Sequence, residues 1–123
     1  MSISPLEEKE SQTIAERRVF ERFDARFPAK LQYTREEFGD RIFLRNVSAQ
    51  GIQFITRDQL FINDSLALEI KLPDSSIPML LRGRVIWSKK EDISIWDVGL
   101  RFHTISLMHI SRLYRLATSG ANK

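Results

Sequence analysis

The chain has 123 residues and a mass of 14.4 kDa, enough for one domain that buries a core of its own. Hydrophobic residues make up 42% and charged residues 28%, which resembles an average globular protein and argues against a disordered or fibrous chain. The sequence contains no cysteine, and this excludes disulfides, thiolate metal sites and a cysteine nucleophile.

The positive charge of the chain is unevenly distributed. The formal net charge is +3, but residues 1–16 hold four glutamates against one lysine and carry −3, which leaves +6 on residues 17–123. Arginine outnumbers lysine by 13 to 6, and its rigid guanidinium suits bidentate binding of phosphates and guanine edges. We therefore expect the folded part of the chain to bind an anionic partner.

The first 16 residues are predicted to form a flexible polar tail, with a short helix around Leu6 to Ala15. They lack the basic start and the apolar stretch of a signal peptide. Apolar runs such as Val85-Ile86-Trp87 span three residues, far fewer than a membrane helix needs. We expect a cytoplasmic protein that does not insert into a membrane.

From Phe27 onward, apolar residues alternate with polar ones at the period of half-buried strands. The alternation predicts six strands, near residues 27–33, 41–47, 51–56, 66–72, 79–89 and 95–102. Short strands at this spacing, separated by turn signals, predict an all-β fold, either an antiparallel barrel or a sandwich.

Beyond Thr104 the apolar period lengthens to three and four residues, which predicts a closing helix. The apolar positions that define it are Leu107, Ile110, Tyr114 and Ala117. Thr104 or Ser106 is available as the N-cap, and the helix is expected to end near Ser119-Gly120. Its apolar face is expected to cover an open end or edge of the barrel.

Two polar motifs are candidates for a binding site. The segment Arg17-Arg18-Val19-Phe20-Glu21-Arg22 places three guanidinium groups just before the first strand, and its β-branched and aromatic residues favour an extended loop. The segment Asn46-Val47-Ser48-Ala49-Gln50-Gly51 lies at a turn between two strands, where amide and hydroxyl groups can meet a base edge or a phosphate. Taken singly, the first is more simply explained as a solvated basic face and the second as a hairpin turn.

Four further residues have side chains that ligands often contact. Trp87 shares the alternation of Leu81, Gly83 and Val85, so we expect it in the core or at the rim of the barrel, with contact to a ligand as the alternative. Trp96 alternates with Val98 and is expected in the core. His103 and His109 have no partner at metal-ligand or catalytic spacing and are expected to be ordinary structural histidines.

The order and spacing of these motifs resemble the PilZ domain family over residues 17–118, nearly all of the chain. The resemblance includes Gly83-Arg84-Val85-Ile86-Trp87 and Val98-Gly99-Leu100-Arg101-Phe102 in the later strands. It implies a six-stranded antiparallel β-barrel with a C-terminal helix that binds cyclic di-GMP and needs no cofactor, metal or catalytic residue. The ligand-binding residues that it implies are Arg17, Arg18, Arg22, Asn46, Ser48 and Gly51, with Trp87 as a further candidate.

The resemblance predicts a binding module, with tails at 1–16 and 119–123, that relays cyclic di-GMP to a protein partner and so controls motility, exopolysaccharide synthesis or virulence. The loop 17–22 is expected to fold over the nucleotide. A barrel that binds protein alone is the alternative. A nucleic-acid binder is less favoured because most aromatic residues fall on core-facing positions, and an enzyme because we find no nucleophile–base pair or metal cluster. A monomer and a homodimer are both compatible with the sequence.

Overall fold

The computed structural model describes residues 21–104 and 106–120. The predictions for the tail at 1–16, for Arg17 and Arg18, and for the last three residues lie outside these ranges. The described elements are β1 (Phe23–Asp24), β2 (Pro28–Leu31), β3 (Ile42–Val47), β4 (Gly51–Thr56), β5 (Ser65–Ile70), β6 (Met79–Asp92), β7 (Ile95–Phe102) and α2 (Leu107–Gly120).

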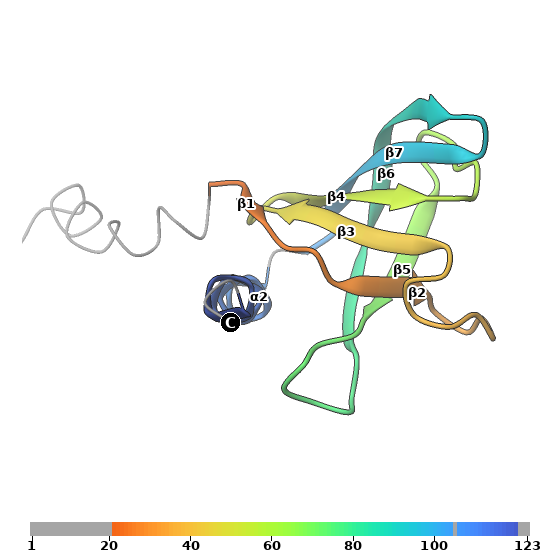
Figure 1. Cartoon of the computed structure of the whole chain (residues 1–123). Coiled ribbons are helices and arrows are strands. Elements are labelled where there is room, and N and C mark those ends of the chain that lie inside the picture. Colours follow the sequence, from red (N-terminus) through yellow and green to blue (C-terminus); the bar gives the residue numbers. More distant parts are fainter. Residues whose placement is uncertain (1–20, 105, 121–123) are drawn as a thin grey trace, which may run out of the picture.

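Six of the strands close into an antiparallel barrel (Figure 1). Going round the ring, β3 pairs with β2, β2 with β5, β5 with β6, β6 with β7, β7 with β4, and β4 with β3 again. The predicted six-stranded antiparallel barrel with a C-terminal helix is confirmed. The structure adds β1, which pairs with the outer part of β3 and which the sequence did not reveal, because a strand of two residues has no measurable alternation.

The barrel is filled by the inward-facing residues of its strands. The largest fully buried side chains on the strands are Ile42, Leu44, Val47, Ile52, Phe54, Leu68, Ile70, Val85, Val98 and Leu100. Most of them fall on the predicted alternation, because side chains of period two reach one face of a pleated strand. Ile110 and Leu113 of α2 belong to the same core, so the helix covers one end of the barrel as expected.

Two details of the prediction were wrong. The first strand ends at Leu31, and Tyr33 lies in a turn with a φ of 68° and 89% exposure instead of facing the core. On the helix, Leu107 is exposed and Leu113 takes its place in the core. The N-cap is Ser106, whose hydroxyl accepts a hydrogen bond of 3.4 Å from the N–H of His109.

Besides its core residues, helix α2 makes two further contacts with the barrel. The ring of Tyr114 packs edge-on against Phe23 of β1, with 5.2 Å between the ring centroids. Arg112 Nη2 donates to Asp74 Oδ1 at 2.7 Å in the β5–β6 connection. The helix therefore supports β1, the short strand that follows the arginine-rich segment (Figure 1).

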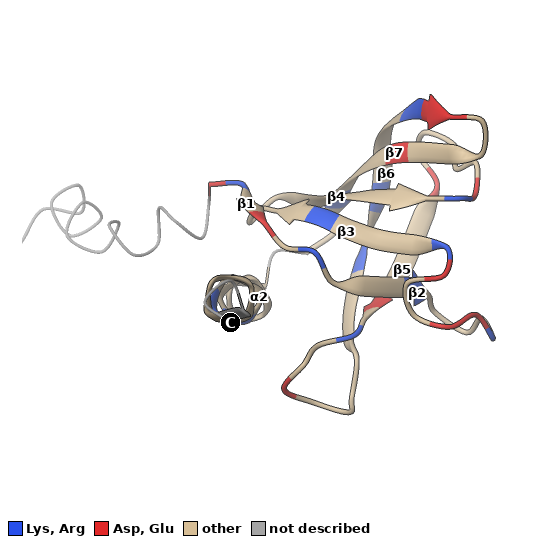
Figure 2. Cartoon of the chain, in the orientation of Figure 1, with Lys and Arg blue, Asp and Glu red and all other residues tan. Residues whose placement is uncertain are grey.

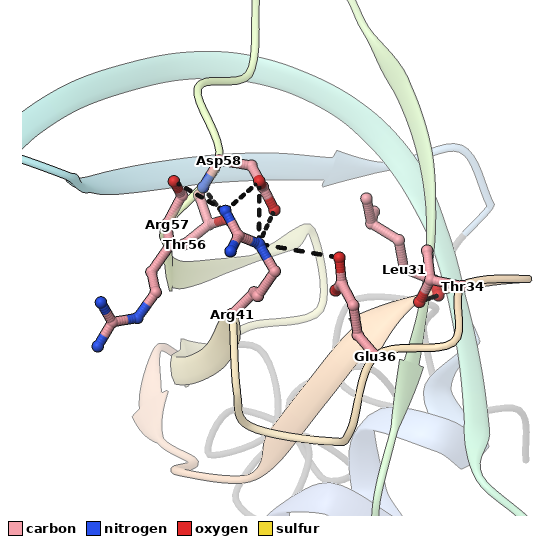
Figure 3. A network of polar contacts seen from close by, with 7 residues as sticks. All are labelled: Leu31, Thr34, Glu36, Arg41, Thr56, Arg57 and Asp58. Carbon is pink, nitrogen blue, oxygen red and sulfur yellow. Dashed lines mark hydrogen bonds and ion pairs between the residues drawn. The ribbon is translucent and has the colours of Figure 1, made fainter.

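A cluster of polar side chains lies at the end of the β3–β4 hairpin that is opposite its turn (Figure 3). Arg41 Nη2 lies 2.6 Å from Asp58 Oδ1, and Arg41 Nε lies 3.0 and 3.1 Å from the two oxygens of the same carboxylate. Glu36 Oε1 lies 3.8 Å from Arg41 Nε. The hydrogen bonds to Asp58, with the nearby negative charges, raise the pKa of Arg41. The positive charge of Arg41 is thus compensated by acidic residues of the barrel itself.

Candidate functional site

Arg22 and Asn46 come from the two sequence motifs and are in direct contact. Strand β1 pairs with β3 so that Asp24 lies opposite Asn46, which brings the residue just before β1 beside the same strand. The Nη1 atom of Arg22 donates a hydrogen bond of 2.5 Å to Oδ1 of Asn46. The short strand β1 therefore joins the end of the arginine-rich segment to the start of the turn motif.

The side chain of Asn46 is held from the other side by a chain of hydrogen bonds. A register shift between Leu44 and Asn46 breaks the alternation of β3, so that neither Arg45 nor Asn46 is buried. Asn46 Nδ2 donates to Gln53 Oε1 at 2.8 Å, and Gln53 Nε2 donates to the two carboxylate oxygens of Asp97 at 2.9 and 2.8 Å. These bonds orient the amide of Asn46 with its oxygen towards Arg22.

This series of hydrogen bonds ends at Asp97, whose side chain is held in place. Its side chain is 7% exposed, and Arg45 Nη1 donates to its Oδ2 atom at 3.1 Å. A buried carboxylate is stable only when donors and an opposite charge compensate for its lost hydration, and Arg45 and Gln53 supply both. Gln53 and Asp97 were not predicted. Their roles depend on the pairing of β4 with β3 and β7, which no local sequence signal reveals.

Ser48 and Gly51 build the turn that follows Asn46. Ser48 is buried, its N–H donates to the carbonyl of Gly51 at 2.9 Å, and its hydroxyl accepts from the N–H of Gln50 at 3.2 Å. A Cβ atom at position 51 would lie 2.0 Å from the carbonyl oxygen of Leu100 on β7. Glycine is therefore required there for the close approach of two backbones.

Trp87 is displaced from the position that alternation predicts. A register shift between Val85 and Trp87 turns the indole to the outside of β6, where it is 38% exposed. Of the two positions expected for Trp87, the core is therefore wrong, and the ring lies on the barrel surface. The ring lies directly over Gly99 of β7, its partner in the ladder. Trp96 is half-buried and packs against the core.

Arg22, Trp87 and the turn surround one small hollow on the barrel surface. It has a volume of about 60 Å³ and is lined by Arg22, Gln50, Gly51, Ile52, Gln53, Ile86, Trp87, Gly99, Leu100 and Arg101. Small-molecule sites usually enclose roughly 300–1,000 Å³, so this hollow is too small to enclose such a molecule and is an open wall on the barrel surface. Two exposed arginines and one indole make this wall suitable for an anion that carries flat rings.

The described residues, 21–104 and 106–120, contain no cluster of three or more histidine, aspartate or glutamate side chains that could hold a metal ion. Within the same ranges, no helix combines the length and apolarity needed to cross a membrane. Of the residues implied by the resemblance, Arg22, Asn46, Ser48, Gly51 and Trp87 lie around the hollow or beside it, and Arg17 and Arg18 lie outside the described part of the chain.

The described residues thus form a closed six-stranded barrel with Arg22 beside a polar turn. The family model of the PilZ domain matches residues 16–119, so the chain belongs to the PilZ family. Domains of this family are typically receptors for cyclic di-GMP and serve as binding or adaptor domains, with the nucleotide as a ligand and not as a cofactor.

One solved structure with the same fold is that of the Bacillus subtilis inhibitor of motility, MotI/DgrA. The two share 21% sequence identity, with a TM-score of 0.55 over 83% of this chain. The matched region covers half of that protein, so the chain spans only part of its length. A comparison with curated proteins gave no match.

Proposed function

We propose that this chain is a receptor for cyclic di-GMP that binds the nucleotide between the loop 17–22 and the turn 46–51, and then presents a changed surface to a protein partner. The observation that carries the proposal is the hydrogen bond between Arg22 and Asn46, because it joins the two motifs within the described structure. The proposed ligand-binding residues are Arg17, Arg18, Arg22, Asn46, Ser48, Gly51 and Trp87.

The chemistry of the wall fits the chemistry of the ligand. Cyclic di-GMP offers two phosphates and two guanines, and guanine presents O6 and N7 as acceptors for a forked donor such as Arg22. The amide of Asn46 can accept from a guanine N–H or donate to a guanine acceptor. Trp87 supplies a flat surface beside these groups. Ser48 and Gly51 contribute through the shape and backbone of the turn, since Ser48 is buried and Gly51 meets β7.

Binding is expected to exchange one hydrogen bond for several. Arg22 must release Asn46 to reach the nucleotide, and Asn46 keeps its orientation because Gln53 still holds its nitrogen. Arg17 and Arg18 then close from the other side. We expect new amide protection over residues 10–25 when the nucleotide saturates the protein. Unchanged exchange at saturation would contradict this closure.

Calorimetry tests the assignment directly. Cyclic di-GMP is titrated into the full chain, with GTP and cyclic AMP as ligand controls. Loss of one charge-assisted hydrogen bond costs about 1.5–3 kcal/mol, so Arg22→Ala is expected to weaken binding by about ten- to 150-fold. Arg57→Ala, which removes an exposed arginine at the other end of β4, is expected to bind like the native chain. Native affinity in Arg22→Ala, or no heat with the native chain, would refute the proposed site.

In this proposal, the ligand also indicates the compartment of the protein and the process that it controls. A receptor for a second messenger is placed in the cytoplasm, where it controls another protein. The structural neighbour MotI/DgrA is an inhibitor of motility, which makes motility the first output to examine. If the native chain gives no heat with cyclic di-GMP, the alternative is a PilZ adaptor that binds protein alone.

A further inference from the structure

On the outer face of β6 and β7, two arginines lie opposite each other across the strands. Arg84 of β6 lies directly opposite Arg101 of β7, and both side chains are exposed. The cross-strand neighbours that continue this row are Ser65 of β5 and Gly51 of β4, neither of them acidic. Like charges directly opposite each other destabilise a sheet, so this arrangement is unfavourable unless an anion covers it.

The next row of the same face extends the positive surface. The N–H of His103 donates to the carbonyl of Arg82 at 3.1 Å, which places these two residues side by side across β6 and β7. Within residues 21–104 and 106–120, the side chains of Arg82, Arg84 and Arg101 form no ion pair or hydrogen bond. Figure 2 shows basic positions along β6. We call Arg82, Arg84, Arg101 and His103 the basic face.

The basic face is hollowed and has an apolar border. A cavity of about 340 Å³ is lined by Asn63, Arg84, Ile86, Arg101, Phe102 and His103. The side chain of Ile86 is 44% exposed at this cavity. A surface that combines two guanidinium groups, one imidazole and an exposed isoleucine suits an acidic peptide that also carries aliphatic side chains.

Residues 1–16 of this chain have the composition of such a peptide. Residues 1–16 include Glu7, Glu8, Glu10 and Glu16, together with the aliphatic Leu6 and Ile14, and carry a net charge of −3. Residues 1–16 precede strand β1, which is anchored on β3. Four strand spacings of about 4.8 Å separate β1 from β6, a distance of about 19 Å. Twenty residues can span up to about 70 Å, so residues 1–16 can reach the whole face.

We propose that the acidic segment 1–16 docks on the basic face formed by Arg82, Arg84, Arg101 and His103. Its glutamates separate the positive charges of Arg84 and Arg101, and its aliphatic residues contact Ile86. The docking needs no nucleotide, although Arg101 and Ile86 also line the hollow beside Arg22, so the docked segment borders the proposed nucleotide site.

A spin label on the segment tests this docking. The chain has no cysteine, so Ser11→Cys gives the full-length protein one labelling position. Paramagnetic broadening is then measured by NMR at the amides of Ser65 and of Arg84 to Ile86, on β5 and β6, which lie three and four strands from the anchor at β1. We expect strong broadening there at low salt and a several-fold decrease in 0.5 M sodium chloride, since salt screens surface ion pairs.

Charge reversal separates docking on this face from general attraction to a basic protein. Arg84→Glu is expected to decrease the broadening at Ser65 and Ile86 about fivefold. Arg57→Glu makes the same charge change at an exposed position near the end of β4 and is expected to leave the broadening unchanged. Broadening confined to β1 and its neighbours, or an equal decrease in both variants, would overturn the proposal.

The same samples keep this test separate from the receptor assignment. Arg84 does not line the hollow beside Arg22, so Arg84→Glu is expected to bind cyclic di-GMP while losing the docked segment. Arg22→Ala is expected to show the opposite pattern, with the broadening kept and the nucleotide affinity lost. If the native chain shows no broadening at Ser65 and Arg84, the basic face is not occupied by residues 1–16. The occupant would then be a separate acidic partner, and the proposal would be wrong.

Discussion

The indole of Trp87 lies so close over Gly99 that a Cβ atom at position 99 would lie 2.2 Å from its Nε1 atom. The two residues are cross-strand partners on β6 and β7, just beyond the register shift that turns Trp87 outward. The absence of a side chain at position 99 therefore allows the ring to lie flat against the barrel beside Arg22. The position of a candidate ligand contact thus depends on a residue that itself offers no functional group.

Gly99→Ala is expected to lift the indole from β7. Because Trp87 is 38% exposed, the ring can move outward, so the fluorescence of Trp87 should shift to longer wavelength while the barrel stays folded. A Trp96→Phe background leaves Trp87 as the remaining tryptophan, since the chain has two. Emission is compared with and without the Gly99→Ala change in that background. An unchanged spectrum would contradict the contact.

Gly51→Ala is expected to act on stability instead. A Cβ atom there meets the backbone oxygen of Leu100 at 2.0 Å, and backbone atoms in the middle of a sheet cannot move aside as a side chain can. We expect a decrease of about 2–4 kcal/mol in the free energy of unfolding, measured by urea denaturation. Gln50→Ala, at the exposed position next to it, is the control and should stay within about 0.5 kcal/mol of the native chain. Similar values for the two variants would disprove the requirement for glycine.

Alternation predicted the strands from Ile42 to Phe102 because each exposes one face to the core and one to solvent. It failed where a register shift inserts an extra residue, as at Trp87, since a bulge has no local sequence signature. It also failed at Tyr33, where a positive φ ends the strand. The outcome at the bulge matters most for function, because it places on the surface a residue that alternation alone would place in the core.

The candidate site was predictable to the extent that its residues are polar and lie in short motifs. Asn46 and Arg22 could be proposed from sequence, and the structure places them in contact. Gln53 and Asp97 could not, because an isolated glutamine or aspartate in a strand indicates an exposed position until the pairing partners are known. Their contact joins residues 44 positions apart, and strand register alone determines it.

The Asp74–Arg112 pair predicts a titration that reports on the position of α2. The hydrogen bond from Arg112 holds the pKa of Asp74 below its ordinary value of 3.8. A depressed carboxylate pKa stabilises the fold at pH values above 3.8, and this contribution is lost as the pH falls through the lower folded pKa. Carboxyl NMR should place the midpoint of Asp74 below 3.8, and Arg112→Gln should raise it. A midpoint that is the same in both proteins would show that the helix does not rest on this contact.

Gln53→Glu tests the chain of hydrogen bonds that orients Asn46. The amide nitrogen of Gln53 donates to both oxygens of the buried Asp97, and a carboxylate at position 53 removes this donor and adds a second negative charge. Two adjacent carboxylates cannot both stay ionised easily, so the pKa of one rises. Because a raised pKa favours the fold below that value, the variant should lose stability as the pH increases. We expect a deficit of about 1–3 kcal/mol at pH 8 that largely disappears at pH 5.

Gln50→Glu is the matched control for this change. It introduces the same charge three residues earlier, on an exposed side chain of the turn, where a carboxylate remains hydrated. Urea denaturation of the two variants at both pH values therefore separates the effect of the buried pair from that of net charge. An equal pH dependence in the two would mean that Asp97 is not held by Gln53. A selective loss in Gln53→Glu would establish that Gln53, the hydrogen-bond partner of Asn46, is held by a carboxylate buried two strands away from Asn46.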